Sequence, residues 1–335
     1  MRILVYDVAA DSGGAATVLK SFYEEFCQDT KNEYVFVLSV FELPEAEHIQ
    51  VLNYPWIKKS PLHRLFFDQF VAHRLVKRYR IDQVLSLQNI ELPHAGVPQV
   101  VYEHNALPFS EYRFKPWEAF RPWFTQQVLG RMMKRSIRRA RKVLVQTNWM
   151  KQEIVRQCRI PAKKVEVRFP QVEMIQTGPY HLSRKKPVFF YPANASAYKN
   201  HKTFLRACRM LKKKGYEDYK VIWTVTGDEN EGIRAIRKEA EDRKLPIIFR
   251  GQMSRQELFE LYTSSVLVFP SYIETIGLPL LEARSVGAWI VAADCLYARE
   301  MVGDYERAEF FETFDAGGLY HCMKRWITEK RTVDI

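Results

Sequence analysis

The chain has 335 residues and carries a formal net charge of +12 at pH 7. Hydrophobic residues make up 47% of it and charged residues 27%, a balance that is ordinary for a soluble globular protein and excludes disorder, collagen and coiled coil as the main description. At roughly 150 residues per domain, this length predicts two domains. No run approaches the ~18 apolar residues of a membrane span.

The first half of the chain alternates short apolar runs with helical periodicity. Asp7 comes too early for a signal peptide, so we expect a strand at the N-terminus. Runs rich in Val, Ile and Leu without polar alternation suit a parallel sheet that is buried on both faces. The predicted strands span residues 3–7, 34–40, 49–54, 83–87, 99–103 and 142–146, and the predicted helices span residues 17–27, 63–80 and 149–158, the last capped by Asn148.

Prolines and a glycine without clear periodicity mark residues 173–186 as a linker. It separates a predicted N-terminal domain, residues 1–172, from a predicted C-terminal domain, residues 187–335, whose terminal helix can pack back on the first domain. In the second domain, strands are predicted at residues 188–191, 220–226, 247–250, 266–270 and 289–293, and helices at residues 201–214, 233–244, 255–264 and 279–285. The predicted fold class is therefore α/β, with two Rossmann-like βαβ domains facing across a cleft. The loops after the strands are the expected place for chemistry.

The segment from Phe269 to Ala283 holds the strongest local signal. A buried strand runs into a loop with Gly277 and then into a helix whose first turn contains Pro279, which suits that position. The free amides there predict a phosphate site at the helix N-terminus. Glu274 and Glu282 flank this site, and both carboxylates can accept hydrogen bonds from sugar or ribose hydroxyls. Spacing alone leaves open whether Glu282 binds a ligand or only stabilises the helix dipole.

The Glu-x7-Glu spacing after a Val-Phe-Pro-Ser strand end closely resembles retaining glycosyltransferases of the GT-B fold, family four, of the bacterial surface-polysaccharide and lipopolysaccharide type. Other stretches resemble the family in the same order along nearly the whole chain. They are the glycine loop with Gly13 and Gly14, the strand end with His104, the strand and helix start at residues 143–148, the donor-phosphate loop with Asn194 and Lys199, and the nucleotide-binding stretches with Gly227 and Met253.

The resemblance implies a role for each of these residues. Glu282 would bind the donor ribose, and Glu274 would hold the donor sugar and diphosphate with the amides of Thr275, Ile276, Gly277 and Leu278. Lys199 would neutralise the diphosphate as the leaving group forms, and His104 would contact the donor sugar. The predicted catalytic residues are therefore His104, Lys199 and Glu274, and the predicted donor site also includes Gly13, Gly14, Asn194, Gly227 and Met253.

The residues themselves leave simpler readings open. Lys199 can be a solvated loop lysine, His104 can be a histidine at the edge of the core, and the two glycines can serve only a tight turn.

The chain departs from the family at one position. Many relatives carry an arginine five residues before the lysine, where this chain has Asn194. The leaving diphosphate then has one fixed cation fewer from this loop, or an arginine elsewhere compensates. The sequence contains no Asp-x-Asp pair, and the acidic run at residues 228–231 is better explained as a loop that caps the next helix, so we expect no metal and no cofactor besides the donor substrate.

Residues 113–142 contain ten basic residues and one acid. Aromatic residues and methionines interleave with these cations, which suits a membrane surface that carries anionic lipids, a phosphate backbone, or a helix whose apolar face is core. We expect membrane contact through Arg131, Lys134, Arg135, Arg138 and Arg139.

The resemblance implies a retaining hexosyltransferase, and the missing Asp-x-Asp pair indicates that it is independent of metal. It would move a sugar from a nucleotide-diphosphate sugar to a hydroxyl of a lipid-linked glycan acceptor, at the inner face of the cytoplasmic membrane and without binding nucleic acid. The cysteines are widely spaced with no CxxC pair, which fits a reducing cytoplasm. The alternatives are a sugar-nucleotide epimerase of the same fold and a basic protein that binds nucleic acid or an anionic surface.

Overall fold

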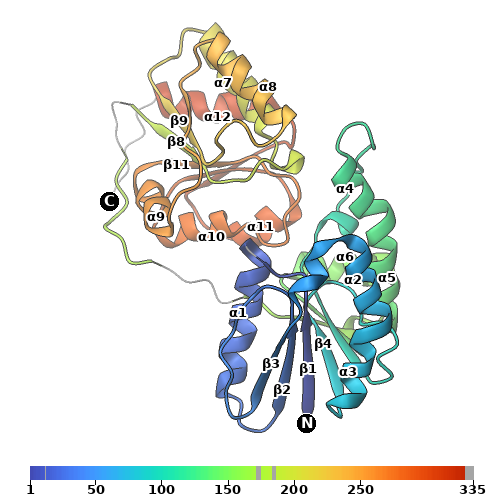
Figure 1. The fold of residues 1–335 in the computed structure, drawn as a ribbon. Coiled ribbons are helices and arrows are strands. Elements are labelled where there is room, and N and C mark those ends of the chain that lie inside the picture. The colour runs from blue at the N-terminus through green and yellow to red at the C-terminus, as the bar shows by residue number, and fades with distance from the viewer. Residues whose placement is uncertain (12, 171–174, 183–185, 329–335) are drawn as a thin grey trace. The chain divides into compact units, whose positions relative to one another are not determined.

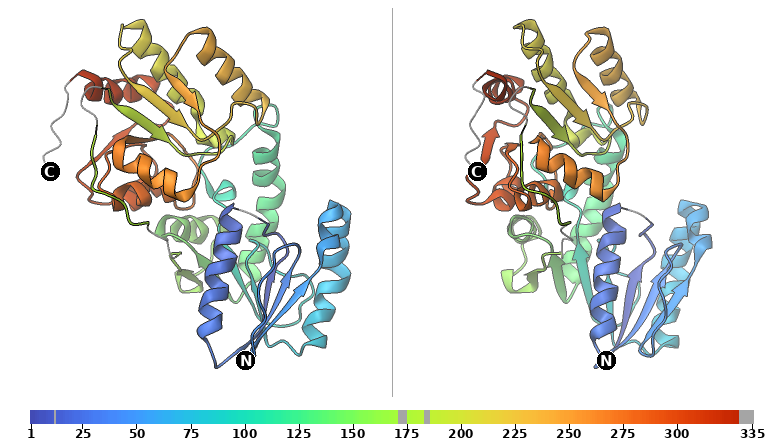
Figure 2. Two further views of the ribbon diagram at one scale, coloured as in Figure 1. Left: turned by 60° about the vertical axis from the view of Figure 1, so that its left-hand side comes forward. Right: turned by 90° about the vertical axis from the view of Figure 1, so that its left-hand side faces the viewer.

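The computed structural model describes residues 1–11, 13–170, 175–182 and 186–328. The chain divides into two compact units, Met1–Gln171 and Val172–Ile335. Each unit is built on a parallel sheet with helices on both faces (Figures 1 and 2), which confirms the predicted pair of βαβ domains. Residues 173, 174 and 183–185 of the predicted linker lie outside the described residues, and residues 175–182 contain no helix or strand. The bounds of the linker therefore stay a prediction.

The first sheet has seven parallel strands in the order β3-β2-β1-β4-β5-β6-β7. Its inner strands are almost wholly buried because helices cover both faces, which explains their runs of apolar residues. The strands are β1 (Arg2–Asp7), β2 (Glu33–Leu38), β3 (Ile49–Asn53), β4 (Gln83–Ser86), β5 (Gln99–Glu103), β6 (Lys142–Val145) and β7 (Val165–Val167). The helices are α1 (Gly13–Gln28), α2 (Pro61–Phe66), α3 (Ala72–Arg78), α4 (Phe120–Phe124), α5 (Gly130–Arg139) and α6 (Asn148–Cys158).

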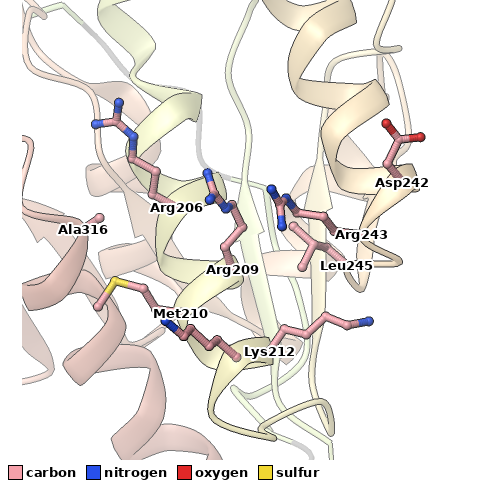
Figure 3. Close-up of a pocket in the computed structure, with 9 residues that line it drawn as sticks. Arg206, Arg209, Met210, Lys212, Asp242, Arg243, Leu245 and Ala316 are labelled. Atoms are coloured by element: carbon pink, nitrogen blue, oxygen red, sulfur yellow. The ribbon is translucent and has the colours of Figure 1, made fainter.

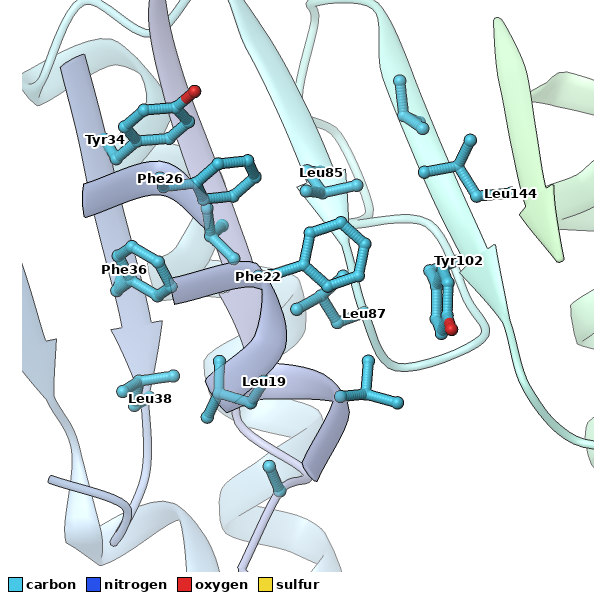
Figure 4. Close-up of a cluster of buried hydrophobic side chains, with 14 of the residues drawn as sticks. Leu19, Phe22, Phe26, Tyr34, Phe36, Leu38, Leu85, Leu87, Tyr102 and Leu144 are labelled. Atoms are coloured by element: carbon cyan, nitrogen blue, oxygen red, sulfur yellow. The ribbon is translucent and has the colours of Figure 1, made fainter. Parts of the chain in front are cut away.

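Aromatic packing between α1 and the sheet forms one half of the first core (Figure 4). Phe22 and Phe26 point from α1 onto the strands, where the Phe26 ring stacks on Tyr34 with centroids 4.1 Å apart and Phe22 meets the edge of Tyr102 at 5.3 Å. Such pairs add to the free energy gained by burying the rings. The contact between Phe22 and Tyr102 lies near the C-terminal end of β5, two residues before the predicted site residue His104, whereas Phe26 and Tyr34 pack at the N-terminal end of β2.

The second sheet has six parallel strands in the order β10-β9-β8-β11-β12-β13. The strands are β8 (Val188–Tyr191), β9 (Lys220–Trp223), β10 (Ile247–Phe249), β11 (Val266–Phe269), β12 (Ile290–Ala293) and β13 (Ala308–Phe311). The helices are α7 (His201–Lys213), α8 (Glu231–Asp242), α9 (Arg255–Ser264), α10 (Leu278–Ser285), α11 (Leu296–Val302) and α12 (Ala316–Thr328).

The structure corrects the sequence predictions at the sheet edges and at one cap. β7 and β13 were not predicted, because each is a short, partly exposed edge strand that leaves no apolar run. The helix α11 was missed, whereas the terminal helix was expected without bounds and is α12. α6 begins at Asn148, so Thr147 rather than Asn148 is its N-cap. The last helix, α12, packs on α7 within the second unit, and its packing on the first domain stays a prediction.

Each sheet has a point at which its strand order reverses. In the first sheet this point lies between β1 and β4, and in the second sheet it lies between β8 and β11. Loops that leave neighbouring strands there turn to opposite faces of the sheet and open a crevice for ligands. The loops after β8 and β11 carry Lys199 and Glu274, so the fold places both predicted residues at the switch point of the second sheet.

Candidate functional site

Two loops that are distant in sequence meet at the switch point of the second sheet. The ammonium of Lys199 is ion-paired with the carboxylate of Glu274, and the two side chains are only 14% and 15% exposed. The Ser271 hydroxyl donates to the same carboxylate oxygen at 2.7 Å. The structure therefore brings together the two residues to which the sequence assigned the diphosphate and the donor sugar.

Backbone contacts hold these loops together. The N–H of Tyr272 donates to the carbonyl of Tyr198 at 3.0 Å, and the Ser271 hydroxyl oxygen lies 3.2 Å from the same carbonyl. The buried hydroxyl of Tyr191 donates to the carbonyl of Lys199 at 2.7 Å. Tyr191 ends β8, while Ser271 and Tyr272 lie in the loop after β11. The spacing between Lys199 and Glu274 therefore depends on these loop contacts and on the pairing of β8 with β11.

The helix α10 begins at the end of the Glu274 loop. Its N-cap, Gly277, has a φ of +77° in the left-handed region, and a Cβ atom there would lie 3.1 Å from the ring of Tyr297. Only glycine combines this conformation with so close a neighbour. With Pro279 in the first turn, the helix offers unpaired backbone N–H groups near Leu278, which favour a phosphate group.

Glu282 lies within α10 and is only 4% exposed. One carboxylate oxygen accepts a hydrogen bond from Arg255 at 2.9 Å, and the other accepts one from the Tyr262 hydroxyl at 2.8 Å. Burial, together with the charge of Glu282, raises the pKa of Tyr262 well above its ordinary value. A buried carboxylate held by two donors from α9 does more than stabilise a helix dipole. The side chain of Arg255 is 43% exposed.

The other residues predicted on the donor side lie in loops after strands. Asn194 is exposed, and its side chain accepts the N–H of Ser196 at 3.0 Å. Gly227 follows β9 with a φ of +98°, and its N–H donates to Glu229 at 3.1 Å. Met253 is partly buried in the loop before α9. These positions agree with a site along the C-terminal edge of the sheet.

The acidic run at residues 228–231 acts as predicted. The side chain of Asn230 caps α8 by accepting the N–H of Ile233 at 3.0 Å. The carboxylate of Glu229 binds the amides of Thr226 and Gly227. Across the described parts of the chain, no cluster of three or more His, Cys, Asp or Glu side chains could hold a metal ion.

His104 follows β5 in the first unit. Its backbone N–H donates to the side-chain oxygen of Asn89 at 2.7 Å, and its ring lies edge-on to the ring of Tyr102. Burial lowers the pKa of His104 to about 4, so the ring is neutral at pH 7. A neutral imidazole can donate or accept one hydrogen bond to a sugar hydroxyl but cannot bind a phosphate as a cation.

The predicted glycine loop lies after β1. Gly13 begins α1, and a Cβ atom on Gly14 would meet no heavy atom within 4 Å. Packing within the unit therefore does not require glycine at position 14. The neighbouring Ser12 lies outside the described residues.

Sequence reasoning missed two buried carboxyl groups at strand ends of the first sheet. Asp7 ends β1 and is 1% exposed, and burial raises its pKa to about 6 although the N–H of Ala10 donates to it. Glu103 ends β5 and is fully buried, and burial raises its pKa well above the ordinary value. An acidic residue as the last residue of an apolar strand is the signal that could have found both.

The predicted membrane-contact residues divide into two groups on α5. Arg131, Arg135, Arg138 and Arg139 are exposed, whereas Lys134 is partly buried. Three of the five also bind within the first unit: Lys134 donates to Gln157, Arg138 donates to the carbonyl of Cys158, and Arg139 is ion-paired with Glu91. Burial, and to a lesser degree nearby arginines, lower the pKa of Lys134. Four of the five predicted cations are therefore exposed, and two of these four, Arg138 and Arg139, also have a partner within the unit.

Exposed apolar side chains accompany this segment. On and before the continuous helical stretch of α4 and α5 they are Trp117, Phe120, Phe124, Val128 and Met132. A second group, which sequence reasoning missed, lies along α2 and the π-helical segment Phe67–Val71 that continues it, and consists of Leu62, Leu65, Phe66 and Phe70. Its spacing of three and four residues was the available signal. Within the described ranges, no helix is both long and apolar enough to cross a membrane.

A cavity of about 740 Å³ lies elsewhere in the second unit, between α7, α8 and α12 (Figure 3). Its lining is rich in arginine and lysine. Two of these arginines, Arg209 and Arg243, are paired with Glu239 at 2.9 and 3.0 Å. The cavity thus lies on an ion-paired surface, and none of the predicted site residues lines it.

Comparisons with known proteins agree with this arrangement. The family model described as Glycosyltransferase Family 4 matches residues 12–172, and the model described as Glycosyl transferases group 1 matches residues 177–334. The O-antigen chain mannosyltransferase B of Escherichia coli is 23% identical over 265 residues, which are 74% of this chain and 67% of that relative. The sulfoquinovosyl transferase of Arabidopsis thaliana is 32% identical over 82 residues, which are 24% of this chain and 16% of that relative.

Solved structures share the fold over nearly the whole chain. The lipopolysaccharide outer core galactosyltransferase WaaB has a TM-score of 0.69 at 18% identity, with 99% of this chain and 92% of that one covered. The Anabaena protein HepE in complex with UDP-glucose has a TM-score of 0.69 at 15% identity, with 98% and 90% covered. These likenesses confirm the predicted GT-B fold.

Proposed function

The chain belongs to glycosyltransferase family 4, a family of retaining, metal-independent enzymes with the GT-B fold, and we propose that it transfers a hexose from a nucleoside-diphosphate sugar to a hydroxyl of a lipid-linked glycan. Transfer of a sugar from a nucleotide sugar follows from the family. The kind of sugar, the acceptor and the site residues are our proposal.

The observation that carries the proposal is the ion pair between Lys199 and Glu274 beside the N-terminus of α10. Without a ligand, each side chain neutralises the other. A diphosphate attracts the ammonium of Lys199 and accepts hydrogen bonds from the amides at the helix N-terminus. The Glu274 carboxylate is then free to accept hydrogen bonds from the hydroxyls of the donor sugar.

The same arrangement favours bond breaking. As the bond between the sugar and the diphosphate breaks, negative charge builds up on the leaving diphosphate. The attraction of Lys199 to that oxygen grows at the same time, so this contact stabilises the transition state more than the ground state. His104, which is neutral at pH 7, would bind a hydroxyl of the donor sugar. The reaction proposed here requires no metal ion and no cofactor, since the nucleotide sugar is itself a substrate.

Binding of the donor is tested by thermal unfolding with a panel of UDP-glucose, UDP-galactose, UDP-N-acetylglucosamine and GDP-mannose. A specific ligand at 100 times its Kd stabilises the folded state by about 2.7 kcal/mol. We expect one member of the panel to raise the melting temperature and the others to have little effect. A protein that none of the four stabilises would contradict the proposed donor class.

The reaction is tested by nucleotide release with and without a glycan acceptor. Release that depends on the acceptor supports transfer. Conversion of the sugar nucleotide without an acceptor would instead indicate the epimerase. Tight binding of a DNA or RNA duplex without donor binding would indicate the basic binding protein.

We further propose that the enzyme works at the inner face of the cytoplasmic membrane. Support comes from the exposed Arg131 and Arg135 and from the exposed aromatic residues on the same helical stretch, such as Phe120 and Phe124. Basic residues attract anionic headgroups, while aromatic rings enter the boundary with the acyl chains. A lipid-linked acceptor would then lie in the membrane that the enzyme binds.

A further inference from the structure

Phe314 has a backbone conformation that is unusual for its type. It lies between β13 and α12 with a φ of +71°, and its side chain is 45% exposed. A bulky residue in the left-handed region costs free energy that glycine would avoid. Outliers of this kind persist where the surrounding structure imposes them, and they cluster at functional sites.

The ring of Phe314 packs on the ring of Tyr272. Their centroids lie 4.7 Å apart, with the planes tilted by 59°. Tyr272 itself is only partly buried, so the two rings together leave an aromatic surface exposed. The strained backbone of Phe314 thus holds a large apolar ring at the surface, where burial in the core cannot be the reason for it.

The backbone of Tyr272 lies next to the proposed donor site. Tyr272 comes two residues before Glu274 and directly after Ser271, which donates to the Glu274 carboxylate. The N–H of Tyr272 donates to the carbonyl of Tyr198, the residue before Lys199. Tyr272 is therefore fixed to both loops that supply the ion pair.

We propose that Phe314 and Tyr272 form a platform for the apolar face of the donor's sugar ring, with the Lys199–Glu274 pair binding the polar edge and the diphosphate. The proposal rests on the proposed function and adds residues that select the substrate. A hexose ring has hydroxyls around its edge and C–H groups on its faces. Aromatic faces carry partial negative charge and attract polarised C–H groups, while a carboxylate binds the hydroxyls. The site would thus distinguish a nucleotide sugar from the bare nucleotide.

The test compares Phe314→Ala with Phe314→Gly. Both substitutions remove the ring, but only glycine relieves the left-handed strain, so the glycine variant should melt at a higher temperature than the alanine variant. Phe314→Tyr keeps an aromatic ring and is the matched control. For each variant, calorimetry measures the Kd of UDP-glucose, UDP-galactose, UDP-N-acetylglucosamine and GDP-mannose beside that of UDP and GDP.

We expect both ring deletions to raise the Kd of the bound nucleotide sugar about 2- to 12-fold. The Kd of the bare nucleotide should not change, and Phe314→Tyr should bind as the wild type does. The proposal is overturned if the two deletions weaken binding in proportion to their loss of stability, or if they weaken the bare nucleotide equally. A wild-type protein that binds none of these nucleotide sugars would overturn the proposed function as well, which separates the two failures.

Discussion

Replacing Glu282 with glutamine keeps the shape of the side chain and removes its charge. In the structure, its two oxygens accept hydrogen bonds from Arg255 and from the Tyr262 hydroxyl. If Glu282 also binds the two ribose hydroxyls of the donor, each of those bonds has a charged acceptor. Hydrogen bonds to charged groups contribute about 1.5–3 kcal/mol and neutral ones about 0.5–1.5 kcal/mol. Glutamine should therefore raise the Kd of the nucleotide sugar roughly 30- to 160-fold, for a loss of about 2–3 kcal/mol over two bonds.

Stability has to be measured beside affinity, because Glu282 also supports the fold. Alanine would leave the hydroxyl of Tyr262, which is 1% exposed, without its acceptor. Such a loss costs about 1–3 kcal/mol of unfolding free energy. Tyr262→Phe is the matched control, since it perturbs the same buried contact and keeps the carboxylate. We expect this control to lower the free energy of unfolding by about 1 kcal/mol and to change donor affinity only slightly.

The assay is calorimetric titration with the nucleotide sugar found in the thermal panel, together with urea unfolding of each variant. Glutamine should weaken binding far more than the Tyr262→Phe control does at a similar stability. A Glu282→Gln protein that binds the donor as tightly as the wild type would refute the assignment. Glu282 would then be a structural residue that links α10 to α9.

Three further predictions concern the leaving group, the membrane and pH. Lys199→Ala should lower kcat more than it raises the KM of the donor, and an effect on KM alone would contradict the role of Lys199 in the transition state. Wild-type turnover should persist in excess EDTA. Loss of turnover that a divalent ion restores would contradict a metal-independent reaction. Replacing the exposed Arg131 and Arg135 with glutamine should weaken binding to anionic liposomes roughly 30-fold, at about 1 kcal/mol per residue, whereas the same change at the partly buried Lys134 should weaken it less. Co-sedimentation at low and high salt measures this binding, and a wild-type protein that ignores anionic liposomes at low salt would exclude membrane contact. Burial raises the pKa of Asp7 from 3.8 to about 6, so the folded state binds this proton more tightly and the contribution of Asp7 to the free energy of unfolding falls as pH rises from about 4 to about 6. Asp7→Asn should remove that fall and leave the variant up to about 3 kcal/mol more stable than the wild type at pH 7. Urea unfolding from pH 4 to pH 7 measures the free energy of unfolding of both proteins. The same dependence of this free energy on pH in both proteins would contradict the prediction.

Local patterns in the sequence were enough to predict the two βαβ units. The strand β5 and the helix α9 begin and end where they were predicted, because a buried apolar strand and a capped amphipathic helix each leave a signal within a few residues. β7 and β13 left no such signal, since short edge strands are partly exposed. The Glu-x7-Glu spacing of Glu274 and Glu282 was also legible, because both residues lie on one continuous segment.

Contacts between distant segments needed the tertiary structure. Lys199 and Glu274 are 75 residues apart and become partners because β8 pairs with β11. No local pattern encodes which strands are neighbours, so the ion pair, the two donors on Glu282 and the Phe314–Tyr272 contact were invisible in the sequence. The same holds for α5, where the cations look equivalent along the chain but Lys134 and Arg138 bind to groups on α6. The sequence determined which residue types are available for chemistry, and the packing of strands and helices decided which of them are buried, paired or free to meet a ligand, because burial and pairing depend on neighbours that folding brings from elsewhere in the chain.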